Sequence, residues 1–186
     1  MFFDWIRTII VLPGSVLVFF PALVLHLSDY RWEFNSIPLF TVGIAFLCAG
    51  LSLAGWTMWL FAKRGQGTAA PWNPPKKLVV EGPYRHVRNP MITSVLILLI
   101  AEALLLNSWW LMGLFALFLG GNMLYFPLIE EKGLEKRFGQ DYLAYKRAVP
   151  RWLPRITPFE PASGGPPSMN PKTPVNCIKV RRRKNH

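Results

Sequence analysis

The stretch MITSVLILLIAEALLL at positions 91–106, followed by Asn107-Ser108 and WWLMGLFALFLGGNMLYFPLI at positions 109–129, decides the fold. A helix needs about 20 apolar residues to cross the hydrocarbon core of a bilayer, and a polar pair between two apolar runs indicates a turn. The first run is short for a span, so we expect it to borrow residues from the turn or to tilt with its partner as a hairpin. Residues 91–129 are therefore predicted to cross the membrane and return.

Two earlier apolar stretches, Thr8–Leu27 and Ile37–Ala62, extend this pattern to four candidate spans. With 52% hydrophobic residues and a mean hydropathy of +0.26, the chain is too apolar for an ordinary soluble domain. The sequence predicts an all-α integral membrane protein with about four transmembrane helices. We divide the chain into three parts: two N-terminal transmembrane helices at 1–62, a core at 63–158 and a basic tail at 159–186.

The net charge of +11 is concentrated in two segments. The segment from Lys63 to Pro90 carries six basic residues and the single acid Glu81, and the part beyond Pro127 carries thirteen basic residues and five acids. Basic loops stay on the cytoplasmic side, and the two spans between these segments return the chain to that side. We therefore expect both termini in the cytoplasm, and we attribute the basic excess to topology and anionic lipid headgroups, not to nucleic acid.

After the fourth span, apolar side chains recur every three or four residues, at Leu134, Phe138, Tyr142, Tyr145 and Val149. This spacing predicts an amphipathic helix along the membrane surface, which Gly139 is expected to divide. Beyond Pro158 the composition turns to Pro, Gly, Ser and Asn before a basic end, which predicts a disordered tail. Topology separates Cys48 from Cys177, and neither has a ligand at metal-site spacing, so we expect no disulfide and no metal site.

Polar clusters stand at both ends of the predicted hairpin. The first is Gly82-Pro83-Tyr84-Arg85-His86-Val87-Arg88-Asn89-Pro90, and the second begins with Glu130-Glu131. A proline in the first turn of a helix leaves exposed amide donors beside it, and a guanidinium fork at such a helix start suits a carboxylate. Arg88 is therefore a candidate for binding a carboxylate, whereas Arg85 is interpreted as a topology determinant.

The paired carboxylates Glu130 and Glu131 lie where the fourth span leaves the bilayer. Neighbours on a helix point about 100° apart, so we expect one to bind a cationic or hydroxyl-bearing ligand and the other to orient the site or act as a base. A solvated helix end is the alternative. His86 titrates near neutrality when unperturbed, so it is a candidate for proton transfer or, alternatively, a surface residue.

Two features outside these clusters need separate interpretations. Gly65 and Gly67 stand in a basic loop just after a span, where missing side chains let the backbone approach a ligand. Glu102 lies inside the third span near its outer end, where it is expected to snorkel or to hydrogen-bond to a neighbouring helix. It is too far from the polar clusters to be a favoured catalytic residue.

Taken together, these blocks resemble the membrane-embedded methyltransferases that include isoprenylcysteine carboxyl methyltransferase and the phospholipid N-methyltransferases. The resemblance covers about residues 63–155. It is carried by Gly65-x-Gly67-Thr68, Gly82-Pro83-Tyr84, Arg88-Asn89-Pro90-Met91, Glu130-Glu131, Phe138-Gly139-x-x-Tyr142-x-x-Tyr145 and Val149-Pro150-Arg151. The core at 63–158 would then be the catalytic part of the chain.

The resemblance implies an S-adenosylmethionine site at the cytoplasmic face. By carry-over, the cofactor would contact Gly65, Gly67, Tyr84, Arg88, Asn89, Pro90, Glu130 and Glu131, and the catalytic candidates are Glu131, Arg88 and His86. The acceptor would be a lipophilic small molecule, a lipid or a prenylated substrate that arrives through the membrane. A carboxylate acceptor needs no base, whereas an amine must lose a proton, for which Glu131 or His86 is the candidate.

This chain departs from the prenylcysteine enzymes at several positions. They have His where Asn89 stands and usually Tyr where Ile92 stands, and they place an arginine shortly before the glutamates, whereas residues 100–129 contain none. The resemblance is therefore closer to the phospholipid and bacterial members. Two other functions are kept as alternatives: a membrane reductase of the sterol-reductase type that uses NADPH, and a non-catalytic membrane adaptor that binds through its basic tail.

Overall fold

The computed structural model describes residues 10–31, 36–65 and 78–160, and its regular secondary structure in these ranges is entirely helical, without a strand. The elements are η1 (Ile10–Phe19), α2 (Phe20–Leu27), α3 (Ile37–Leu60), η2 (Phe61–Gly65), η3 (Gly82–Arg85), α4 (Pro90–Leu105), α5 (Trp109–Tyr125), η4 (Phe126–Glu130) and α6 (Glu131–Ala148). The prediction of an all-α chain is confirmed for the described residues. Thr8, Gly67, Cys177 and the predicted tail beyond residue 160 lie outside them.

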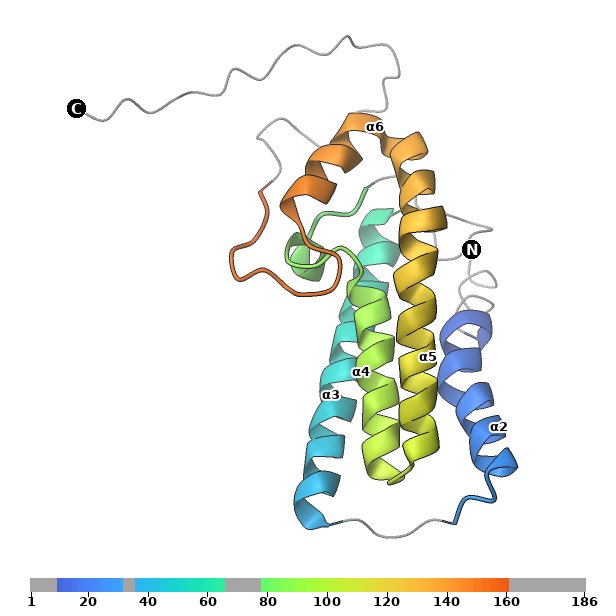
Figure 1. The fold of residues 1–186 in the computed structure, drawn as a ribbon. Helices are drawn as coiled ribbons and strands as arrows, with labels where there is room; N and C mark the ends of the chain where they lie inside the picture. The colour runs from blue at the N-terminus through green and yellow to red at the C-terminus, as the bar shows by residue number, and fades with distance from the viewer. Residues whose placement is uncertain (1–9, 32–35, 66–77, 161–186) are drawn as a thin grey trace, which may run out of the picture.

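The helices α3, α4 and α5 lie side by side, with α2 beside α5 (Figure 1). The closest packing joins α3 to α4, where Gly43 and Gly50 of α3 face α4. A Cβ added to Gly43 would come within 2.9 Å of the Leu105 side chain, and one added to Gly50 within 2.7 Å of Leu98. Glycine is therefore required at these positions for the two helices to approach so closely.

The central helix of the bundle is α4, which packs against both α3 and α5. Its middle is buried between α3 and α5, and Leu99 and Ala101 are completely inaccessible to solvent. The turn that follows contains Asn107 at φ 48°, and the Tyr30 hydroxyl donates a hydrogen bond to the carbonyl of Leu106 there. The polar pair between the two apolar runs thus marks the turn of the hairpin.

Two continuous helices are long and apolar enough to cross a membrane, Ile37–Arg64 and Trp109–Ala148. Within the molecule, only 11% and 6% of their most apolar segments are buried, and large side chains such as Leu117 and Leu124 remain exposed. A core helix of a soluble protein would be covered by its neighbours, so these surfaces suit lipid. The other two predicted spans correspond to shorter apolar helices, Pro13–Leu27 and Pro90–Leu105.

The long helix formed by α5, η4 and α6 bends at Gly139, where φ is 55° and ψ is −128°. This conformation favours glycine, so Gly139 divides α6 as expected. The second half of α6 folds back over the segment that precedes α4 (Figure 1). Its apolar face covers protein, since Tyr142, Tyr145 and Val149 are buried with Leu78 and Val80 packed against them. Attachment of α6 to a membrane surface stays a prediction.

After α6, residues 149–160 run as an irregular segment, here called the C-terminal strap, beside the turn that holds η3 (Figure 1). Backbone hydrogen bonds of 3.0 Å join Arg88 N–H to the carbonyl of Pro150, Arg155 N–H to that of His86 and Phe159 N–H to that of Arg85. The Phe159 ring also lies 5.9 Å from that of Tyr145. The strap is therefore docked onto the bundle as far as Phe159, the first residue of the predicted tail.

Candidate functional site

The segment Gly82–Pro90 forms a tight turn against the end of α3. Gly82 has a φ of 54°, and a Cβ there would lie 3.0 Å from Leu60 and 3.1 Å from Trp56. Tyr84 is buried, and its carbonyl accepts a 2.6 Å hydrogen bond from the Tyr145 hydroxyl. Contacts with α3 and α6 thus hold the turn from two sides.

Arg88 and Asn89 lead directly into α4. Asn89 caps the helix through its backbone, since its carbonyl accepts the N–H of Thr93 at 3.0 Å, and Pro90 occupies the first helical position. The Arg88 side chain is only 9% exposed, and its Nη1 lies 2.9 Å from Oε1 of Glu131. The two ends of the hairpin meet in this ion pair, as the two polar clusters were predicted to do.

Glu131 begins α6 and binds three cations although its side chain is only 3% exposed. Oε1 accepts Arg88 Nη1 and also Arg151 Nε at 2.7 Å, while Oε2 lies 2.8 Å from Lys146 Nζ. Burial disfavours the charged form of Glu131, but the hydrogen bonds from Arg151 and Lys146, with the charge of Arg88, outweigh it and hold the pKa of the carboxyl below its usual value. The carboxylate is therefore ionised at neutral pH.

Glu135 completes this group, since it lies 2.7 Å from Lys146 Nζ. We call Arg88, Glu131, Glu135, Lys146 and Arg151 the charged cluster. Three cations and two carboxylates leave it with one positive charge. In addition, Arg88 Nε is buried without a partner among the described residues. The charged cluster therefore has both the charge and a free N–H donor to accept an anionic group.

Glu130 has different surroundings from its neighbour, as helix geometry predicts. It is half-buried at the end of η4, where burial raises the pKa of its carboxyl against the opposing charge of Arg137. Glu131 is held as a carboxylate by three donors, whereas Glu130 binds a proton more readily. The two glutamates therefore present different chemistry at one point of the chain.

The family model for phospholipid methyltransferases matches residues 39–141, which is 103 of the 186 residues. The chain belongs to the phospholipid methyltransferase family. The suspected resemblance is thus confirmed for its phospholipid branch. Comparisons with curated proteins and with solved structures give no match.

Within the part that matches the phospholipid methyltransferase family, the described site residues other than Tyr84 and His86 occupy three places. Arg88 and Glu131 belong to the charged cluster, with Glu130 beside it and Asn89 and Pro90 at the start of α4. Gly65 ends η2, at the end of the long helix that begins with α3. Glu102 lies about 20 Å along α4 from the turn, so the helix keeps it away from the charged cluster.

His86 and Arg85 face the C-terminal strap. Nδ1 of His86 lies 2.8 Å from the carbonyl oxygen of Arg155, while Nε of Arg85 donates a 2.8 Å hydrogen bond to the Phe159 carbonyl. A carbonyl can only accept, so Nδ1 of His86 carries a proton, and in the neutral ring the lone pair belongs to the other nitrogen, Nε2. Arg85, interpreted from the sequence as a topology determinant, also anchors the strap.

Three polar residues near the Arg88–Glu131 pair were not assigned from the sequence. Lys146 and Arg151 bind Glu131 directly, and Tyr142 is buried near Arg88. Burial, and then the charge of Glu131, raises the pKa of Tyr142 against the opposing charge of Arg88, so its hydroxyl stays neutral. Tyr142 was expected as part of an apolar face and of a motif that carries the resemblance, and neither indicated that Tyr142 lies near Arg88.

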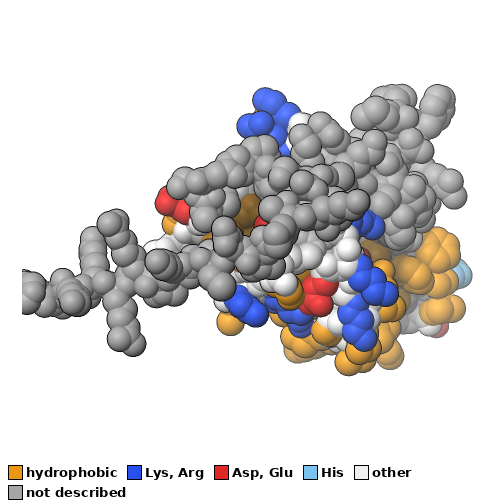
Figure 2. Space-filling view, turned by 90° about the horizontal axis from the view of Figure 1, so that it is seen from above, with side chains coloured by type: hydrophobic (Ala, Val, Ile, Leu, Met, Phe, Trp, Pro, Cys, Tyr) orange, Lys and Arg blue, Asp and Glu red, His pale blue; other side chains and the backbone are white. Residues whose placement is uncertain are grey.

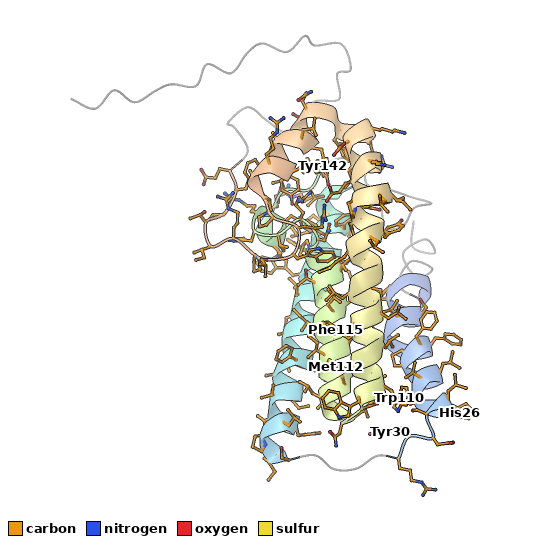
Figure 3. The ribbon with its side chains drawn as sticks, viewed as in Figure 1. His26, Tyr30, Trp110, Met112, Phe115 and Tyr142 are labelled. Carbon is orange, nitrogen blue, oxygen red and sulfur yellow. The ribbon has the colours of Figure 1, made fainter. Side chains whose placement is uncertain are left out.

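The polar side chains gather at the α6 end of the molecule. Around Tyr142, beneath α6, side chains tipped with nitrogen and oxygen crowd together, whereas His26, Tyr30 and Trp110 lie at the opposite end (Figure 3). Seen from the α6 end, basic and acidic side chains lie next to one another above an apolar flank (Figure 2). The charged cluster thus lies at one end of a bundle with exposed apolar sides.

Proposed function

We propose that this chain is an integral membrane methyltransferase that transfers a methyl group from S-adenosylmethionine to a lipophilic acceptor carrying an amine or a carboxylate. The observation that carries the proposal is the buried Arg88–Glu131 pair of 2.9 Å. It joins the two polar ends of the hairpin inside the part that matches the phospholipid methyltransferase family. We further propose that the end of the bundle that holds the charged cluster, together with both termini, faces the cytoplasm.

The residues of the charged cluster fit S-adenosylmethionine by their chemistry. The unpartnered Nε of Arg88 and the net positive charge suit a carboxylate, and Glu130 supplies a carboxyl group for an ammonium or hydroxyl groups. When bound, the cofactor would supply a methyl group attached to a sulfonium, and the leaving group would be a neutral thioether. The protein then has to bind, align and exclude water.

A lipophilic acceptor can reach this end of the bundle from the side. Leu128 and Ile129 precede Glu130 on the same helix, and each is 58% exposed. A lipid against these side chains would bring its polar group to the level of Glu130. We therefore propose an acceptor whose apolar part stays in the bilayer while its reacting group meets the polar end of the protein.

An amine acceptor has to lose a proton, and two groups are available to take it. Glu130 has a raised pKa, which makes it a stronger base than Glu131, whose carboxylate is bound by three cations. Nε2 of His86 is the second, because Nδ1 donates to Arg155. We assign Glu131 to holding Arg88 in place and the proton to Glu130 or His86.

Binding of S-adenosylhomocysteine to the purified protein in detergent tests the proposed function. Wild type should bind it saturably, and Arg88→Ala should weaken binding at least about tenfold, since a charge-assisted hydrogen bond contributes roughly 1.5–3 kcal/mol. Lys132→Ala is the matched control, because Lys132 is exposed and lies next to Glu131. NADPH should give no thermal stabilisation. Absence of saturable binding by folded wild type would refute the proposal.

A further inference from the structure

The C-terminal strap lies beyond residue 141, where the family match ends, yet it returns to the proposed site. Its backbone hydrogen bonds reach Arg85, His86 and Arg88 in the turn that precedes α4. The docked strap carries Arg151 to Glu131, 20 residues back along the chain. A residue outside the matched part therefore contacts the carboxylate at the centre of the charged cluster.

Arg151 and Arg88 share one oxygen of Glu131. Nε of Arg151 lies 2.7 Å and Nη1 of Arg88 lies 2.9 Å from Oε1. Lys146 occupies Oε2, but it divides its charge with Glu135 and is 35% exposed. Arg151 is the only other described residue with an ion pair to the oxygen that binds Arg88.

We propose that Arg151 is a positioning residue that acts through Glu131: it keeps the carboxylate charged and fixed, so that Arg88 holds its free Nε toward an anionic ligand. This inference depends on the proposed function, because the ligand is the carboxylate of the methyl donor. Arg151 is not a catalytic residue, since Glu131 separates it from Arg88.

The physical reason lies in the burial of Glu131. A carboxylate removed from water stays ionised only if enough donors surround it. The groups that face it are Arg88 from the turn, Lys146, Glu135 and Tyr142 from α6, and Arg151 from the strap. Without Arg151, Oε1 keeps one donor, Glu131 takes up a proton more easily, and Arg88 loses the partner that fixes it.

A double-mutant cycle for S-adenosylhomocysteine binding tests this role on the full-length protein in detergent. Arg151→Gln and Glu131→Gln should each weaken binding roughly tenfold, as for loss of one charge-assisted bond. If Arg151 acts through Glu131, the double variant should bind no more weakly than Glu131→Gln alone. Additive losses would overturn the inference, as would wild-type affinity in Arg151→Gln.

The pH dependence of binding separates positioning from a general loss of structure. As the pH falls from about 7 to about 5, Arg151→Gln should lose more affinity than wild type and Arg151→Lys, because a less stabilised Glu131 becomes protonated. Protonation of Glu130, whose pKa is raised, affects all three proteins alike, so the difference between their profiles is the measured quantity. Arg147→Gln is the control, because it removes the same charge from an exposed position of α6. A profile of Arg151→Gln parallel to that of wild type would overturn the inference.

Two further results decide the remaining cases. Where Arg151→Gln does not fold, Arg151→Lys carries the test: it should bind about threefold less tightly than wild type, because lysine keeps the charge but not the planar fork. Unchanged affinity in that variant would count against the inference. If wild type itself does not bind S-adenosylhomocysteine, the proposed function fails instead, so the two failures are distinct.

Discussion

Replacing Glu131 by glutamine is the strongest perturbation of the charged cluster. The change removes one negative charge from a side chain that is 3% exposed and leaves Arg88, Lys146 and Arg151 around a neutral amide. Removal of one partner from a buried ion pair costs about 3–5 kcal/mol. Lys146 and Arg151 are 35% and 26% exposed, so water compensates them in part, and we expect a loss of about 3 kcal/mol.

Thermal unfolding in detergent, followed by tryptophan fluorescence, measures this loss. For a chain of this size, about 3 kcal/mol corresponds to a fall in Tm on the order of 10 °C. Glu135→Gln is the matched control: it removes the same charge from a residue that is 33% exposed and bound to Lys146 alone, and should cost less than about 1 kcal/mol. Equal shifts for the two variants would refute the reasoning.

The pH dependence of the Glu131→Gln effect gives a second check. The pKa of Glu131 is lower in the folded protein than the usual 4.5. Its charge therefore stabilises the fold fully above about pH 4.5, and this contribution is lost as the pH falls through the folded pKa. The Tm difference between wild type and Glu131→Gln should be constant from pH 8 to about pH 6 and should shrink in acid. A difference that grows in acid would show that the charge is not the cause.

Three other variants test the fold around the site. Gly82→Ala should lower the stability of the fold more than Gly139→Ala. Both substitutions place a side chain at a positive φ, which costs about 1–3 kcal/mol, but only a Cβ at Gly82 also meets Leu60 and Trp56. Equal Tm shifts would contradict this reasoning. Gly50→Leu should separate α3 from α4 and lower the Tm, whereas Gly55→Leu, with open space around it, should not. A chain that ends after residue 160 should keep nearly the full affinity for S-adenosylhomocysteine, whereas a chain that ends after residue 148 should not bind it. Equal affinities of the two variants would show that the strap has no role in binding.

The hairpin could be predicted from the sequence because the residues that begin and end its helices are local signals. Pro90 and the pair Asn107-Ser108 bound an apolar run, and α4 begins and ends within one residue of the prediction. Gly139 was recognised as a break for the same reason. The meeting of the two polar clusters followed from topology, since a hairpin that crosses and returns brings its two ends together. The ion pair between Arg88 and Glu131 was not predicted, because Arg88 was expected to bind a ligand carboxylate.

The surroundings of Glu131 could not be predicted in this way. The direction of the chain after Gly139 depends on one backbone conformation, and no periodic pattern encodes it. The strap docks largely through backbone hydrogen bonds of irregular segments, which every residue except proline can donate, so they leave no residue-specific signal in the sequence. Lys146 and Arg151 are recognisable in the sequence as basic residues. Their contact with Glu131 forms only when the chain turns at Gly139 and the strap docks.

The buried carboxylate of Glu131 makes the packing of three segments at the polar end of the bundle cooperative. Its donors come from three segments: the turn before α4, the second half of α6 and the strap. Any one of them alone would leave the carboxylate short of donors, at a cost of several kcal/mol, so each segment is stabilised by the presence of the others. Arg88 and Glu131 lie inside the family match, whereas Lys146 and Arg151 lie beyond its end at residue 141. Two donors beyond the matched residues therefore complete the surroundings of a carboxylate within them.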